Sequence, residues 1–84
     1  MEYLPSDDMY KRLKNSFVYH APFADQTTRY EIIRKAGLTM ALAIVQMTPP
    51  SREQSLSITA IEEAVMRANQ AIALNETPQS ITAP

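Results

Sequence analysis

The sequence predicts an all-α protein in which a short N-terminal helix precedes a long antiparallel helical hairpin. Prolines divide the 84 residues into three segments, and within each segment apolar residues recur at helical spacing without strand-like alternation. Hydrophobic residues make up 45% of the chain, which is ordinary for a globular protein. We expect one helical domain over residues 1–77 and a flexible tail at residues 78–84.

The first helix is expected over residues 6–17. Ser6 is the predicted N-cap, and two aspartates follow it where the helix dipole favours negative charge. Tyr10, Leu13 and Phe17 fall on one face. A helix of about three turns is too short to be stable alone, so we expect it to pack on the hairpin and cover part of its apolar surface.

Residues 18–25 form an irregular, proline-containing stretch that carries the rings of Tyr19, His20 and Phe23. One interpretation is a loop packed over the helix pair, with His20 satisfied by a backbone carbonyl. The other is direct contact with a ligand, which makes His20 a candidate binding residue. The sequence leaves both interpretations open.

The second helix is expected over residues 26–47, where apolar residues follow the spacing of a coiled-coil seam. The seam residues are Tyr30, Ile33, Gly37, Met40, Ile44 and Met47. A second stripe of Leu38, Leu42 and Val45 lies off this seam, so the helix is apolar on more than one side. Pro49 then ends it, because proline lacks the backbone donor.

The third helix is expected over residues 51–75 and opens with a capping box formed by Ser51 and Gln54. Its seam residues are Ile58, Ile61, Val65, Ala68 and Ile72. The short connection at residues 48–50 makes the second and third helices an antiparallel hairpin. Because further leucines and alanines widen the apolar surface beyond this seam, we expect a homo-oligomer.

The composition argues against several classes of function. The chain has no cysteine and one histidine, so it offers no disulfide framework, thiol nucleophile or zinc cluster. A single glycine, Gly37, cannot form a phosphate loop or a dinucleotide fingerprint. We expect no enzyme, no catalytic residue, no metal and no cofactor. The net charge of −1, the lack of a long apolar run and the lack of a signal-peptide pattern argue against long nucleic acids, membranes and secretion.

Arg67 is the first candidate binding residue. It lies on the side of the third helix opposite the seam, where a guanidinium can bind a phosphate through two parallel hydrogen bonds. The simpler interpretation is an ordinary pair with Glu63, four residues earlier.

Two further groups of residues have the chemistry of small anion sites. Gln26, Thr28 and Arg29 lie at the start of a helix, where free backbone N–H groups face solvent. Tyr10 offers a ring that can stack on a base, and Lys11 and Lys14 lie beside it. Each group also fits an ordinary helix surface. Together they favour a compact anionic nucleotide over a long nucleic acid.

Four segments carry a resemblance to a known family: F-V-Y-H-A-P at 17–22, D-Q-T-T-R-Y-E-I-I-R at 25–34, P-S-R-E-Q-S-L at 50–56 and I-E-E-A-V-M-R-A-N-Q-A-I-A-L-N-E at 61–76. The chain resembles phage sponges that counter CBASS, the bacterial anti-phage signalling based on cyclic oligonucleotides. Their helical hairpin domain also occurs in some sponges that inhibit Thoeris defence.

This resemblance implies a homohexamer that binds cyclic dinucleotides, and in some cases cyclic trinucleotides, in separate pockets between protomers. The ligand is sequestered without cleavage in the cytoplasm of the infected bacterium, so the CBASS effector is not activated. By position, Tyr10 is the candidate stacking residue of the dinucleotide pocket, and Gln26 stands near where some relatives carry a lysine. Thr28 and Arg67 resemble residues of the trinucleotide pocket.

Two alternatives stay open at this point. The same periodicities fit a helical, oligomeric protein–protein interaction module without a nucleotide ligand, in which Tyr10, Thr28 and Arg67 are ordinary surface residues. A ligand similar to cyclic ADP-ribose, as implied by the Thoeris-directed relatives, also remains open.

Overall fold

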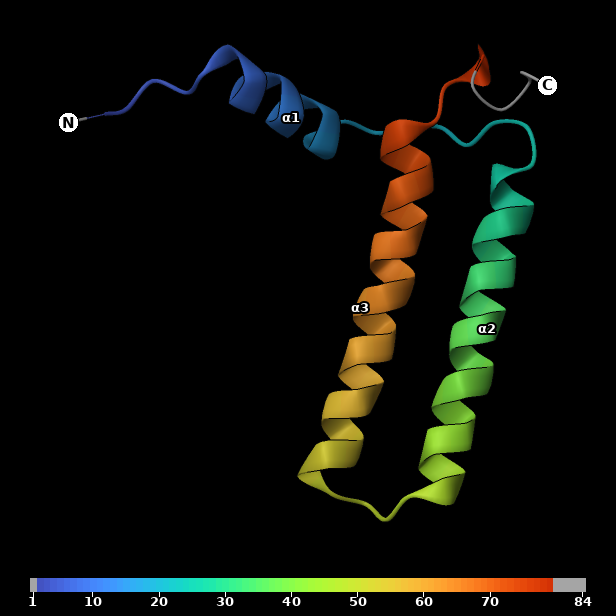
Figure 1. Cartoon of the computed structure of the whole chain (residues 1–84). Helices are drawn as coiled ribbons and strands as arrows, with labels where there is room; N and C mark the ends of the chain where they lie inside the picture. Colours follow the sequence, from blue (N-terminus) through green and yellow to red (C-terminus); the bar gives the residue numbers. More distant parts are fainter. Residues whose placement is uncertain (1, 80–84) are drawn as a thin grey trace.

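The computed structural model describes residues 2–79 and contains the helices α1 (Asp7–Phe17), α2 (Gln26–Met47) and α3 (Arg52–Asn75). α2 and α3 lie side by side and antiparallel, and α1 projects away from the open end of this hairpin (Figure 1). The all-α prediction is confirmed, and each helix begins within one residue of the expected position. Of the predicted tail, 78–84, the structure describes only Pro78 and Gln79, which have helical backbone; residues 80–84 lie outside the described part.

Serine side chains begin two of the helices. Ser6 Oγ accepts the N–H of Met9 at 3.1 Å, and Ser51 Oγ accepts the N–H of Gln54 at 3.1 Å. The predicted capping box is therefore half formed. The Gln54 amide donates instead to the carbonyl and hydroxyl oxygens of Thr48, each at 3.1 Å. This contact closes the turn between α2 and α3.

The two long helices approach each other closely where Gly37 faces Val65. A Cβ atom at position 37 would lie 2.5 Å from Val65 Cγ2, so a side chain fits only if the Val65 side chain or the helices shift. The expected seam is formed in part: Ile33, Gly37 and Ile44 are half-buried, but Met40 and Met47 are exposed, and Ala41 lies in the contact instead.

Gly37→Ala is expected to destabilise the chain despite the better helix propensity of alanine, which is worth about 1 kcal/mol. Overpacking of this kind costs about 1–3 kcal/mol, and the clash with Val65 is the physical reason. Urea unfolding at fixed protein concentration measures the change. In the Val65→Ala background the same substitution is expected to be neutral or stabilising; a stabilising effect in both backgrounds would contradict the close contact.

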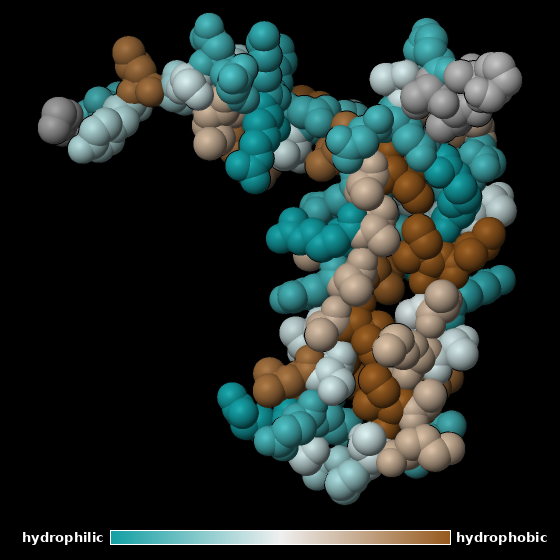
Figure 2. All heavy atoms as spheres, viewed as in Figure 1, coloured by the Kyte–Doolittle hydropathy of each residue, from teal (hydrophilic) through white to brown (hydrophobic). Residues whose placement is uncertain are grey.

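The hairpin does not enclose a hydrophobic core. Among the described residues no hydrophobic side chain is buried, and the radius of gyration is 17.4 Å against about 12 Å for a compact chain of this length. Apolar grooves lie on both sides of the Gly37–Val65 contact, one beside Leu38 and Ile58 and the other beside Met40 and Ala64. Figure 2 shows the hydrophobic stripe that runs along the hairpin. A chain of this shape leaves exposed the apolar surface whose burial normally stabilises a fold.

α1 does not cover this surface, so that expectation was wrong. Its N-terminal part points away from the hairpin, and Tyr10, Leu13 and Phe17 remain exposed (Figure 1). Val18 ends α1 in an extended conformation, which carries the chain past the end of α3 instead of folding α1 back. The amide of Asn15 donates to the Leu74 carbonyl at 3.2 Å and ties the end of α1 to α3. No helix of residues 2–79 is long and apolar enough to cross a membrane.

Candidate functional site

Gln26 and Arg29 lie in a cluster that joins the start of α2 to the end of α3. The Arg29 guanidinium binds both carboxylate oxygens of Glu76, with Nη1 donating to Oε2 at 2.7 Å. Gln26 is buried; its amide nitrogen donates to Glu76 at 3.3 Å, and its oxygen accepts the N–H of Phe23 at 3.1 Å. Asp25 does not cap α2 through its side chain, and its carboxylate lies 3.2 Å from Arg29 Nε. These side chains join the start of α2 to the residue that follows α3.

The contacts in this cluster shift the pKa values of Arg29 and Glu76 in the directions that favour their charged forms. The hydrogen bond from Arg29 lowers the pKa of Glu76, against an opposing effect of desolvation, and Gln26 adds a weaker lowering effect. The hydrogen bond to Glu76 likewise raises the pKa of Arg29 further above its ordinary value. Both groups are charged throughout the neutral range.

The stability that Glu76 provides is expected to be complete above about pH 4.5, its usual pKa, and to be lost as the pH falls through the lowered value. Protonation removes the acceptor charge that Arg29 and Gln26 bind. Glu76→Gln is therefore expected to be less stable at pH 7 and less sensitive to acid than the wild-type chain. Urea midpoints between pH 7 and pH 3 measure this, with Glu31→Gln as an exposed control. An unchanged acid dependence in Glu76→Gln would contradict the assignment.

His20 lies beside a backbone carbonyl, which is the contact that the first interpretation expects. Its Nε2 lies 2.7 Å from the carbonyl oxygen of Asn15, within hydrogen-bond distance, and the ring is half-buried. The side-chain amide of Asn15 also donates a hydrogen bond to the Leu74 carbonyl. His20 and Asn15 together fix the direction in which α1 leaves the hairpin.

Arg67 is exposed on α3 and does not form the expected pair with Glu63. Its Nη1 donates to Gln70 Oε1 at 3.0 Å, and within residues 2–79 its guanidinium makes no ion pair. Arg67 faces a cleft of ≈ 580 Å³ between α1 and the C-terminal half of α3. Its remaining donors are available to an anion.

Four of the other candidate residues do not line this cleft. Thr28 is exposed in the first turn of α2, and Tyr10, Lys11 and Lys14 are exposed on α1. None of these four side chains lines the cleft that contains Arg67. The structure therefore does not bring these four residues to the cleft of Arg67.

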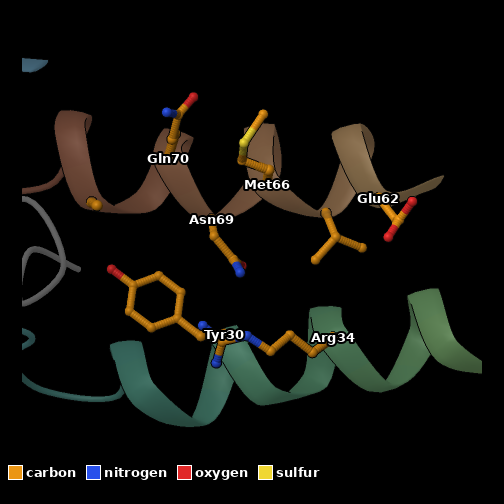
Figure 3. Close-up of a pocket in the computed structure, with 8 residues that line it drawn as sticks. Tyr30, Arg34, Glu62, Met66, Asn69 and Gln70 are labelled. Carbon is orange, nitrogen blue, oxygen red and sulfur yellow. The ribbon is translucent and has the colours of Figure 1, made fainter. Parts of the chain in front are cut away.

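A second cavity, of ≈ 460 Å³, lies in the groove between α2 and α3 and was not predicted from the sequence (Figure 3). Figure 3 shows Tyr30 and Arg34 of α2 facing Asn69 of α3 across it. Asn69 Oδ1 is buried and accepts no hydrogen bond from residues 2–79. Tyr30 was expected in the apolar seam. The available signal was the four-residue spacing of Tyr30 and Arg34, which places both on one face of α2.

The described residues contain no group of three or more acidic, histidine or cysteine side chains arranged to hold a metal ion. The candidate residues instead provide guanidinium, amide, hydroxyl and aromatic groups. Such groups suit recognition of a phosphate and a base.

Comparison with known families gives the class of protein that this fold and these residues define. The model of the family described as "Acb2/Tad1, hairpin domain" matches residues 9–73, which include α2 and most of α1 and α3. The chain belongs to this family, which confirms the resemblance found in the sequence. Family membership implies the general role of a cyclic nucleotide sponge, a class of generally non-catalytic binders. No curated protein and no solved structure matched the chain.

Proposed function

We propose that this chain binds cyclic dinucleotides, cyclic trinucleotides or both, and sequesters them without cleavage, so that CBASS effectors in the infected bacterium are not activated. The family match over residues 9–73 carries this proposal. Sequestration needs affinity and sufficient copies of the binding protein, and it needs no complementarity to a transition state. The proposed place of action is the cytoplasm of the host.

Self-association is the second part of the proposal, with a homohexamer as the assembly. The exposed hydrophobic surface supports it, since the described chain buries no hydrophobic side chain and has apolar grooves on both faces of its hairpin. The separation of the candidate residues supports it as well, because side chains far apart in one protomer can meet at an interface between protomers.

Each candidate residue has a proposed role in the assembled site. Tyr10 stacks on a base while Lys11 and Lys14 attract phosphates, and Thr28 and Arg67 contact the larger ring.

Gln26 and Arg29 are both engaged with Glu76, so we assign them the role of holding the first turn of α2, which presents Thr28. We assign His20 the role of holding the end of α1 through its contact with the Asn15 carbonyl.

Ligand recovery tests the proposal directly. The purified chain is incubated with a panel of cyclic dinucleotides and trinucleotides and with a ligand similar to cyclic ADP-ribose, separated from free ligand, heated, and the released ligand is identified by mass spectrometry. Retention and release of an intact ring supports a sponge. Recovery of linear product would instead indicate a nuclease.

The apolar grooves of the hairpin also fit a protein-interaction module that docks partner helices. If the chain is such a module, the folded oligomer is expected to retain none of the cyclic nucleotides. Substitution of Arg67 is then expected to have no effect on partner binding.

A further inference from the structure

The cleft between α1 and α3 is lined by a second arginine, which was not among the candidate residues expected from the sequence. Arg12 of α1 and Arg67 of α3 both line it, and none of the described residues that line it is acidic. The cleft volume of ≈ 580 Å³ lies within the range of about 300–1,000 Å³ for small-molecule sites. The shape and the charge both fit a compact anion.

The two guanidinium groups are not neutralised within residues 2–79. Arg67 donates one hydrogen bond to Gln70, a neutral group, and Arg12 is exposed without a hydrogen bond or ion pair to the described residues. Arginine stays protonated at any physiological pH and offers five donors. Two like charges beside one cleft repel each other, and an anion between them removes this repulsion.

Side-chain contacts of Asn15 and His20 near the cleft join the segment of Arg12 to the end of α3. Asn15, one turn after Arg12, donates to the Leu74 carbonyl at 3.2 Å, and its own carbonyl lies 2.7 Å from His20 Nε2. These contacts join α1 to the end of α3, so the two arginines belong to one partly preorganised surface. Figure 2 shows hydrophilic side chains around the angle between α1 and the hairpin.

We propose that Arg12 and Arg67 of one protomer together bind a phosphodiester group of the nucleotide ligand, with the exposed ring of Phe17 at the same cleft as a stacking surface for a base. This inference rests on the proposed function and adds Arg12 and Phe17 to its binding site. Bidentate binding by each guanidinium accounts for the preference for phosphate. The aromatic face then distinguishes a nucleotide from inorganic phosphate.

Isothermal titration of the full-length oligomer tests the inference with cyclic dinucleotides, cyclic trinucleotides and, as a simple anion, inorganic phosphate. Arg12→Ala is expected to lower affinity for the preferred ring about 10- to 100-fold, and Arg12→Lys is expected to retain part of it. Combining Arg12→Ala with Arg67→Ala is expected to cost less than the product of the single effects, because both residues contact one phosphate. Phe17→Leu is expected to weaken binding of the ring without changing binding of phosphate.

Arg52→Ala serves as the matched control, because it removes an exposed arginine from the opposite end of α3. Circular dichroism and sedimentation confirm that each variant keeps its fold and assembly. Wild-type affinity in Arg12→Ala would overturn the inference and leave the proposed function standing. Competition by inorganic phosphate as strong as that of the ring would overturn the nucleotide assignment of the cleft. Absence of binding of any ring by the wild-type chain would overturn the proposed function and the inference together.

Discussion

Arg67→Ala is expected to lower the affinity for a cyclic trinucleotide by about 10- to 150-fold and to leave the oligomer intact. The range corresponds to about 1.5–3 kcal/mol for hydrogen bonds made by a charged group. Arg67 has no carboxylate partner in the described chain, so its removal leaves no buried charge behind, and its contact with Gln70 lies on the exposed face of α3. Titration of both proteins with the same ring, with sedimentation alongside, measures the two effects separately.

Arg52→Ala is again the control, since both substitutions remove one positive charge from α3. The two positions are 15 residues apart along the sequence, or roughly 22 Å along a helix. An equal small loss of affinity in both variants would indicate an effect of the net charge of the oligomer. An unchanged affinity in Arg67→Ala would remove Arg67 from the binding site.

Leu38→Glu is expected to dissociate the assembly and to unfold the chain at micromolar concentration. Leu38 is 60% exposed in the protomer and lies at the apolar groove beside Ile58. In the proposed oligomer it is covered by another protomer, so the substitution removes about 1.5–3 kcal/mol of apolar burial per chain. It also places a charge in the interface. Because the described chain buries no hydrophobic side chain, loss of the interface removes its main source of stability.

Thr39→Glu places the same charge on the neighbouring exposed residue of α2, which points away from Leu38 on the helix surface. It is expected to keep the mass and the unfolding midpoint of the wild-type chain. The midpoint of the wild-type chain is expected to rise with protein concentration. A midpoint independent of concentration, with a folded monomer in sedimentation, would contradict assembly through this face.

The helices were predictable because their signals are local. Prolines, serine caps and apolar spacing specify where a helix begins and ends, and Ser6 and Ser51 act as predicted. The antiparallel hairpin followed from a connection too short to allow another arrangement. Gly37 was recognised as a seam residue, and its close contact with Val65 gives the physical reason for a glycine there.

The direction of α1 was not predictable because it depends on few contacts. Its amphipathic face suggested packing on the hairpin, but the extended backbone at Val18 and the single side-chain bond from Asn15 to Leu74 direct it elsewhere. The pairing of Arg29 with Glu76 spans 47 residues, and no local pattern marks it. The same is true of Arg12, which became a candidate only when the structure placed it beside the cleft of Arg67.

The central claim is that the oligomer binds an intact cyclic oligonucleotide between protomers. Isothermal titration of the purified oligomer against cyclic dinucleotides and trinucleotides, with mass determination alongside, tests it most directly. The account predicts tight, saturable binding at less than one ring per chain, with the assembly mass increased by whole ligands. Absence of binding across the panel by a folded oligomer would contradict the account.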